Sequence, residues 1–284
     1  MNKVKIIVDS TADLTPEYIK ENDIVVLPLG VTFGEEYYRD GVDITTEELY
    51  ARVAKEGMLP KTNAISIGAA IELFKKYVDE GYDVFYTGIS SKMSSSYNNT
   101  CIAAQEFDEG RVVVYDSYNL STGIGLQILK AVKLRDEGKS AIEIKEYLET
   151  KIKNNVRAQF LIEQMDYLHK GGRCSSLVHF LANSFRIKPI IRVKDGSMSV
   201  YKKPIGKLLN ACNTLIDVFK KDMNNIDPDC VMITSSSAPV AEKYIYEKVA
   251  ELIDPSKIMI THAGCVISSH CGPGTIGILY ILKD

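Results

Sequence analysis

The sequence lacks tryptophan, and no apolar stretch in it approaches the length of a membrane span. A transmembrane helix needs roughly 20 mostly apolar residues, so we expect none here. The apolar run at residues 6–8 is also far too short for the core of a signal peptide, and no small-residue cleavage site follows it. We therefore expect a cytoplasmic protein.

Metal ligands and disulfide partners are also scarce. The six cysteines form no C-x-x-C pair, and the four histidines show no H-E-x-x-H spacing. Metal sites and disulfide frameworks usually have recognisable spacings of these residues. We therefore expect reduced thiols and no metal site.

Signatures of nucleotide binding and of hydrolytic catalysis are missing as well. The sequence contains no G-x-x-x-x-G-K-[ST] phosphate loop and no G-x-S-x-G nucleophile elbow. Gly272, Gly274 and Gly277 match the dinucleotide pattern G-x-G-x-x-G formally. Only seven residues follow Gly277, however, which leaves no room for the helix and second strand that this pattern requires. We expect no resident cofactor.

The composition is that of a globular protein with a substantial core. The chain has 284 residues, of which 45% are hydrophobic and 25% are charged, and its formal net charge is −3. This length favours two domains of ordinary size. A mildly acidic chain argues against a nucleic-acid partner, because nonspecific binding to nucleic acid needs a basic surface.

The first half of the chain alternates between two patterns. Short β-branched runs lie at residues 4–8, 25–29, 84–87 and 112–115, and helical patterns lie between them. Apolar runs bounded by turn residues are typical of buried parallel strands. An alternation of strands and helices predicts an α/β domain, which we place at residues 1–155, with a doubly wound and mostly parallel sheet.

Two helix starts in this half carry a capping signature. Thr45 with Glu48, and Ser140 with Glu143, have the spacing of a capping box, in which each side chain satisfies a backbone N–H group of the other residue. Both positions are therefore predicted N-termini of helices.

The second half has a different pattern. Residues 189–193 and 198–202 are β-prone and flank an Asp195-Gly196 turn, which is a strong hairpin signal. Further apolar runs follow, with a helical pattern between them. We predict a C-terminal α+β domain at residues 156–284, with a mixed or antiparallel sheet.

A cluster of serines is the most informative polar feature. Five of the seven residues from 90 to 96 are serines, Lys92 is the one cation among them, and a helix is expected to start inside the cluster. Hydroxyls and backbone N–H groups at a helix N-terminus form an anion site, and the low positive charge suits a carboxylate. A serine-rich helix cap is the alternative, which explains one or two serines but not five.

Other polar residues lie beside predicted strand ends or glycine-rich turns. Thr62 and Ser66 lie at a predicted helix start. Ser66 is most simply the N-cap residue, whereas Thr62 lies outside the helix and its hydroxyl is free to bind a ligand. Arg173 follows two glycines and suits either an oxyanion clamp or an ordinary helix end. His270 stands beside a Gly-Pro-Gly turn that would hold its imidazole in place.

Three more polar residues lie within two positions of the end of a predicted strand. Asp9 and Ser10 come after the first run, and Ser117 comes after the run at residues 112–115. In open α/β sheets, ligands bind at the carboxyl ends of the strands. The residues alone thus predict a two-domain α/β protein with a hydroxyl-lined anion site and no recognisable catalytic group.

These segments, taken in order along the chain, resemble the DegV family, which includes the fatty-acid-binding subunits of bacterial fatty acid kinase. Each segment alone is a weak signal, but six of them in the family's order are specific. The matching segments are residues 8–14, 89–94, 116–117, 167–173, 187–190 and 270–274, which span nearly the whole chain.

The resemblance implies that a long-chain fatty acid such as palmitate lies between the two domains. Its carboxylate would meet Thr62, Ser94, the backbone N–H of Ser95, and His270. Ser95 stands where the family usually has glycine. In the segment at residues 62–66, only Thr62 and Ser66 match the family pattern.

The resemblance also implies a role in a larger system. A separate ATP-dependent kinase subunit would phosphorylate the bound carboxylate, so this chain would be a lipid-binding protein with no catalytic residue of its own. Arg173, Asp9, Ser10 and Ser117 would lie near the headgroup or face the partner. Transient contact with a membrane surface would accompany fatty acid exchange.

Two alternatives stay open from the sequence. The chain could be a stand-alone small-molecule kinase or hydrolase that uses Asp9, Ser94 and His270. It could also be a regulator that binds a sugar or a nucleotide and no lipid, in which case its pocket would be too short or too polar for an acyl chain.

Overall fold

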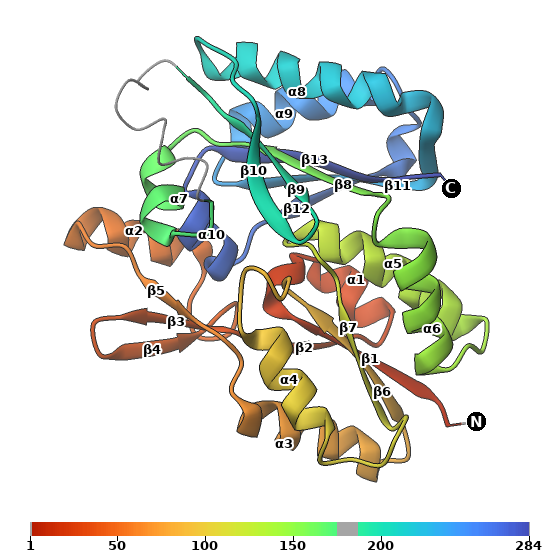
Figure 1. The fold of residues 1–284 in the computed structure, drawn as a ribbon. Helices are drawn as coiled ribbons and strands as arrows, with labels where there is room; N and C mark the ends of the chain where they lie inside the picture. The colour runs from red at the N-terminus through yellow and green to blue at the C-terminus, as the bar shows by residue number, and fades with distance from the viewer. Residues whose placement is uncertain (1, 175–186, 284) are drawn as a thin grey trace.

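The computed structural model describes residues 2–174 and 187–283, and the strands within this part of the chain form three sheets (Figure 1). The first is a parallel sheet in the order β2-β1-β6-β7. The second has the order β10-β9-β8-β13-β11-β12 and is antiparallel apart from the parallel pair β11–β12. A small antiparallel sheet has the order β4-β3-β5.

The bounds of the elements follow the chain in this order. The strands are β1 (Val4–Asp9), β2 (Val25–Leu27), β3 (Gly30–Phe33), β4 (Glu36–Arg39), β5 (Lys61–Asn63), β6 (Asp83–Gly88), β7 (Val112–Asp116), β8 (Val156–Leu161), β9 (Ile190–Lys194), β10 (Ser197–Lys202), β11 (Ile226–Ser236), β12 (Ile258–His262) and β13 (Thr275–Leu282). The helices are α1 (Pro16–Glu21), α2 (Thr46–Glu56), α3 (Ile67–Asp79), α4 (Ser96–Ala104), α5 (Thr122–Asp136), α6 (Ala141–Tyr147), α7 (Met165–Gly171), α8 (Leu208–Asp222), α9 (Pro239–Ala250) and α10 (Cys265–Cys271), with the short helical turn η1 at Ser10–Ala12.

The parallel sheet is covered by helices on both faces, as a doubly wound sheet requires. In β1, Ile6 belongs to a core cluster that includes Ile124 of α5, whereas its neighbour Ile7 belongs to a second cluster that includes Phe74 of α3. Successive side chains of a strand point to opposite faces, so both faces of β1 are buried. The predicted fold class is therefore confirmed in its first half.

The large mixed sheet is covered on one face by α8 and α9, whose apolar side chains form a cluster with strands β11 and β13. The predicted hairpin is confirmed as β9 and β10, with Asp195 and Gly196 at φ values of 51° and 78° in the turn. Both capping boxes are also confirmed, at the starts of α2 and α6.

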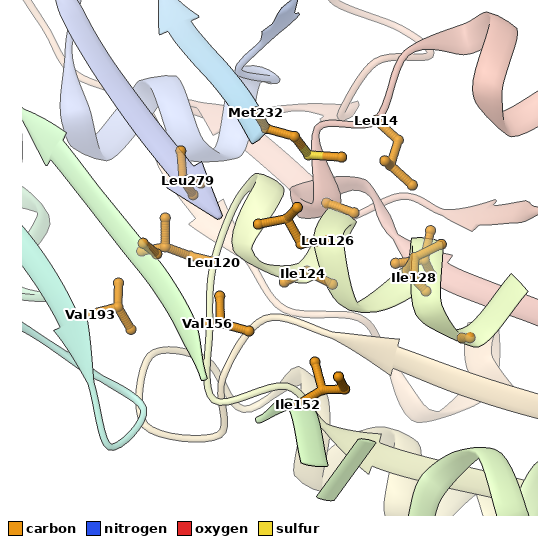
Figure 2. Close-up of a cluster of buried hydrophobic side chains, with 14 of the residues drawn as sticks. Leu14, Leu120, Ile124, Leu126, Ile128, Ile152, Val156, Val193, Met232 and Leu279 are labelled. Carbon is orange, nitrogen blue, oxygen red and sulfur yellow. The ribbon is translucent and has the colours of Figure 1, made fainter. Parts of the chain in front are cut away.

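Helix α5 lies between the two large sheets and contacts strands of each, including β1, β8 and β13 (Figure 1). Its residues from Thr122 to Ile128 are all buried. Figure 2 shows Ile124, Leu126 and Ile128 of this helix packed with residues from both halves of the chain. One continuous apolar cluster thus joins the two sheets, and the domain division at residue 155 stays a prediction.

Candidate functional site

A cavity is lined by residues from both halves of the chain. It holds about 1060 Å³ of empty space when the open solvent at its mouth is included. Most of its wall is apolar, so it suits a ligand with a long apolar segment. The larger apolar side chains of the wall are Leu29, Ile89, Met93, Leu120, Phe160, Leu168, Met198, Val266, Ile267 and Leu279.

Several of the polar residues of the wall were singled out in the sequence. They come from the strand β5, the loop before α4, the end of α7 and the helix α10, which are far apart along the chain. These residues are Thr62, Ser94, Ser95, Arg173 and His270.

Thr62 and His270 meet directly at this cavity. Thr62 is held in β5 by pairing with Val31 of β3, and its Oγ1 lies 2.9 Å from Nε2 of His270. The imidazole packs closely against α7, because a Cβ built on Gly171 would lie 2.3 Å from Nδ1 of His270. A side chain at position 171 would therefore push the imidazole away from Thr62.

His270 is neutral at physiological pH. Burial, together with the nearby positive charge of Arg173, lowers the pKa of His270 to about 4. A neutral imidazole has one N–H donor and one acceptor nitrogen. Its Nδ1 faces Gly171 of α7, is buried and has no hydrogen-bond partner among the described residues. In the tautomer with the proton on Nε2, the imidazole donates to Oγ1 of Thr62, which leaves the hydroxyl hydrogen of Thr62 for a ligand.

The serine loop is tied to the same region by hydrogen bonds. Oγ of Ser94 and Oγ of Ser96 lie 3.0 Å apart, and Oγ of Ser96 accepts a hydrogen bond of 3.2 Å from the backbone N–H of Ile65. Ile65 is three residues after Thr62, so these bonds bring the loop close to Thr62. The predicted helix start is confirmed, because α4 begins at Ser96.

Ser95 is the N-cap residue of α4, and its side chain makes no capping hydrogen bond. The first N–H groups of a helix have no acceptor within the helix, and the helix dipole places partial positive charge there. The N–H group of Ser96 already donates to Oγ of Ser94 over 3.2 Å, so the backbone donors left at the start of α4 are those of the neighbouring residues.

Arg173 lies at the exposed side of this polar region. Its Nη1 donates a hydrogen bond of 2.7 Å to the carbonyl oxygen of Gly171, the residue that packs against His270. Its side chain is exposed and lines the cavity. The cavity thus combines apolar walls with hydroxyl, N–H and guanidinium donors.

Three other predicted residues do not line this cavity. Asp9 is fully buried, and its carboxylate accepts hydrogen bonds from the backbone N–H groups of Thr11 and Ile89. Ser10 donates to Asp40. Ser117 is buried, and its hydroxyl donates to the carbonyl oxygen of Gly88 over 2.6 Å.

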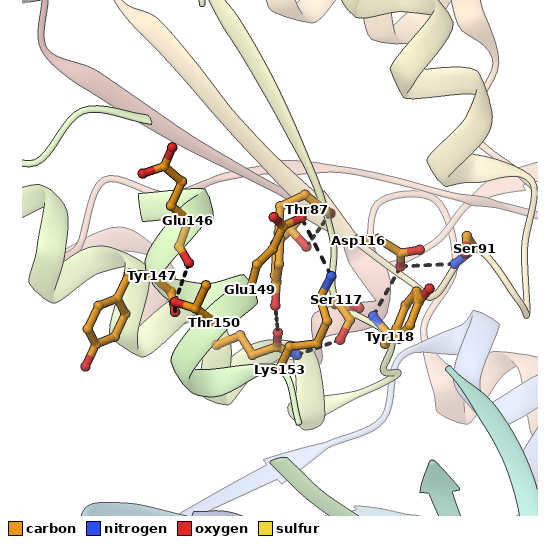
Figure 3. A network of polar contacts seen from close by, with 12 residues as sticks. Thr87, Ser91, Asp116, Ser117, Tyr118, Glu146, Tyr147, Glu149, Thr150 and Lys153 are labelled. Carbon is orange, nitrogen blue, oxygen red and sulfur yellow. Dashed lines mark hydrogen bonds and ion pairs between the residues drawn. The ribbon is translucent and has the colours of Figure 1, made fainter. Parts of the chain in front are cut away.

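The residues around Ser117 form a network that Figure 3 shows from close by. The carboxylate of Asp116 accepts hydrogen bonds from the backbone N–H groups of Ser91 and Tyr118, over 3.2 and 3.1 Å. These bonds hold the loop after β7 against the start of the serine loop. Asp9, Ser10 and Ser117 therefore support the loops of the site in this structure, and their predicted role near the headgroup or a partner stays a prediction.

Several other hydroxyl side chains line the cavity and were not predicted from the sequence. The sequence contained a signal for them, because β11 ends in a run of serines. Ligands of open α/β sheets bind at the carboxyl ends of strands, so these serines were candidates as well. The missed residues are Ser121, Thr234, Ser235, Ser236 and Thr275.

Within residues 2–174 and 187–283, no group of three His, Cys, Asp or Glu side chains is placed to hold a metal ion. None of the helices described in these ranges combines the length and the apolar character that crossing a bilayer requires.

The fold and the cavity define an α/β protein with two large sheets and a mostly apolar ligand cavity. A family profile described as "Uncharacterised protein, DegV family" matches residues 3–283. The chain belongs to the DegV family, and the resemblance seen in the sequence is confirmed.

Relatives of known sequence match over their full length. A DegV domain-containing protein of Clostridium acetobutylicum is 36% identical over 285 residues, which cover 100% of both chains. A DegV domain-containing protein of Clostridium perfringens is 34% identical, with 99% of both chains covered.

Solved structures share the fold. A DegV family protein from Thermus thermophilus, described by its fatty acid binding, superposes with a TM-score of 0.90 at 25% identity, covering 99% of this chain and 100% of that one. A stearic-acid-binding protein from Eubacterium ventriosum superposes with a TM-score of 0.86 at 29% identity, covering 100% of this chain and 99% of that one.

Proposed function

We propose that this protein binds a long-chain fatty acid, with the acyl chain in the apolar cavity and the carboxylate among Thr62, Ser94, Ser95 and His270. The observation that carries this proposal is a mostly apolar cavity in which hydroxyl and N–H donors come together from separate segments. The structural neighbours described as fatty-acid-binding proteins support it.

The energetics favour such a ligand. Burying an apolar chain contributes about 0.8 kcal/mol per methylene, so a 16-carbon chain gains roughly 12 kcal/mol before the costs of association. Placing a carboxylate in a site of low polarity costs several kcal/mol unless donors meet it. The hydroxyl of Thr62, the hydroxyl of Ser94 and the start of α4 supply those donors.

The second part of the proposal is that the bound carboxylate is presented to a separate ATP-dependent kinase subunit in the cytoplasm. Because His270 is neutral, no buried cation neutralises the carboxylate, which keeps it nucleophilic toward a phosphoryl group. The exposed Arg173 at the cavity supports an opening on this side toward a partner. Transient contact with a membrane surface, as a route for fatty acid exchange, belongs to the same proposal.

The alternative of a stand-alone kinase or hydrolase gains no support from the geometry. It requires Asp9, Ser94 and His270 to act together on one substrate. Asp9 does not line the cavity, and both oxygens of its carboxylate already accept hydrogen bonds from Thr11 and Ile89. We therefore favour a lipid-binding protein that is not catalytic alone.

The first test is native mass spectrometry of the purified protein, followed by identification of any extracted ligand. We expect one fatty acid per chain. A protein that carries no lipid and also fails to bind added palmitate or oleate would refute the binding function.

The proposed presentation to a kinase has its own test. Purified kinase subunit and ATP should yield acyl phosphate only when this protein carries a fatty acid. ATP turnover by this chain alone would contradict its substrate-presenting role.

A further inference from the structure

Helix α10 forms a wall of the cavity and carries His270. Val266, Ile267, His270 and Cys271 of this helix all line the cavity. The helix is short, and the Cα of His270 lies only about 7.5 Å along the axis from Cys265, at 1.5 Å per residue. Whatever fixes the start of α10 therefore also fixes the imidazole that meets Thr62.

Two carboxylates from the first half of the chain hold the start of α10. The backbone N–H of Gly264 donates to Oδ1 of Asp13 over 2.8 Å, and the N–H of Cys265 donates to Oδ1 of Asp40 over 2.7 Å. The first N–H groups of a helix have no partners within it, and negative charge is favourable there. These hydrogen bonds connect residues more than 200 positions apart in the sequence.

The second oxygen of each carboxylate is also used. Oδ2 of Asp13 accepts a hydrogen bond from Ser121, which lines the cavity, and Oδ2 of Asp40 accepts one from Ser10. Each aspartate is therefore fixed on both sides, and neither can rotate without breaking a bond. The predicted site residue Ser10 acts here through Asp40.

Both carboxylates are buried at an energetic disadvantage. Asp13 and Asp40 are 7% and 2% exposed, and neither forms an ion pair within the described part of the chain. Burial raises the pKa of both side chains. Burying a carboxylate without a neighbouring cation costs free energy of folding. A role in fixing the position of α10 explains why Asp13 and Asp40 are buried here despite that cost.

We propose that Asp13 and Asp40 are positioning residues of the ligand site, which fix the start of α10 and thereby set the Thr62–His270 contact that orients a bound carboxylate. This inference rests on the proposed fatty acid binding. It extends the site to two residues that do not line the cavity.

Other contacts keep α10 folded when one carboxylate is removed. Thr46 donates to the carbonyl oxygen of Ala263 over 2.8 Å, and the hydroxyl of Tyr50 lies 3.3 Å from the carbonyl oxygen of Ser268. The loss of Asp13 or Asp40 therefore shifts α10 rather than releasing it. The shift should harm recognition of the headgroup more than burial of the acyl chain.

The test compares affinities for palmitate and for hexadecanol, which share a chain length but differ in the headgroup. In Asp13→Ala and Asp40→Ala, palmitate affinity should fall about tenfold, the loss expected for a displaced hydrogen bond to a charged group, while hexadecanol affinity changes less than about twofold. Asp13→Asn and Asp40→Asn keep an acceptor oxygen and should restore palmitate affinity. Asparagine also tolerates the positive φ of 50° at position 13.

The control is Ser140→Ala, which removes the N-cap of α6 and leaves α10 unchanged. A purely structural role would lower the affinities for both ligands together, or leave them both unchanged, and either result overturns the inference. If the wild-type protein binds neither ligand, the proposed function itself fails, which is a distinct outcome.

A second variant covers the case in which an alanine variant does not fold. In Gly264→Ala, the new Cβ would lie 3.2 and 3.3 Å from the two oxygens of Asp40 and 3.4 Å from Oδ1 of Asp13, so both carboxylates stay but must move slightly from α10. Palmitate affinity should fall about threefold with hexadecanol affinity unchanged. An unchanged ratio of the two affinities contradicts the inference here as well.

Discussion

Oγ1 of Thr62 lies 2.9 Å from Nε2 of His270, and this contact joins strand β5 to helix α10 at the polar part of the cavity. Each residue helps to hold the other in place at the wall of the cavity. The contact also makes the two residues interdependent, because a change in the ring position of His270 alters which groups Thr62 can bind.

Removal of the Thr62 hydroxyl should weaken fatty acid binding. We expect Thr62→Val to raise the dissociation constant of palmitate by an amount equivalent to about 1–3 kcal/mol, because the carboxylate loses a donor in a buried site. Isothermal titration calorimetry measures the change. Thr150→Val, at an exposed helical threonine outside the cavity, is the matched control, and equal affinities of the two variants would remove Thr62 from the site.

Addition of a methyl group at Gly171 should displace His270. The Cβ of Gly171→Ala would lie 2.3 Å from Nδ1 of His270, so the imidazole must move away. We expect palmitate affinity to fall about tenfold, as for the loss of one hydrogen bond to a charged group. Gly68→Ala is the matched control in α3, where a Cβ meets nothing within 4 Å; a similar affinity of both variants would show that the ring position does not matter.

Arg173 should matter more for a partner than for the ligand. Its side chain is exposed, and its Nη1 bonds to the carbonyl oxygen of Gly171. We expect Arg173→Ala to lower kinase-coupled formation of acyl phosphate at least about tenfold, with palmitate affinity within about threefold of wild type. The measurement needs the kinase subunit and ATP. Wild-type turnover in the variant would contradict a partner-facing role.

The neutral state of His270 predicts a pH dependence of stability. Its ordinary pKa of 6.5 in the unfolded chain falls to about 4 in the folded protein, because of burial and the charge of Arg173. Between these values the unfolded chain binds more protons, so the free energy of unfolding falls as pH drops from about 6.5 to about 4. The stabilisation is present above pH 6.5 and should amount to roughly 3 kcal/mol.

Urea denaturation of wild type and His270→Gln across this pH range measures the effect. Glutamine does not titrate, so the variant should lose less stability on acidification. Burial raises the pKa of Asp9 to about 6, which acts in the opposite direction but equally in both proteins, so it cancels in the difference. Parallel pH profiles would show that His270 is protonated normally in the folded protein.

Features that depend on neighbouring residues were predictable from the sequence. The capping box of Thr45 and Glu48 and the turn at Asp195-Gly196 both formed as expected. Each depends on backbone and side-chain geometry within about four residues, so the local sequence contains the necessary information.

The small sheet β4-β3-β5 was not predicted. The run at residues 25–29 read as one strand, but β2 ends at Leu27 and β3 begins at Gly30 in a different sheet. The pairing of β3 with β5 joins Gly30 to Asn63. Strand pairing over such a separation depends on packing around both strands, which the alternation of residues along one strand does not reveal.

The α/β class, the family and several polar residues of the cavity could be predicted from the sequence, because strand and helix periodicity, capping and motif order are properties of the chain alone. The fold brings Thr62 into contact with His270, places Asp9 and Ser117 where they support loops, and sets Asp13 and Asp40 at the start of α10. These contacts join residues up to 251 positions apart, and they arise because the two large sheets share one apolar core through α5. A local sequence pattern cannot predict these contacts, because the segments come together only when the common core is buried.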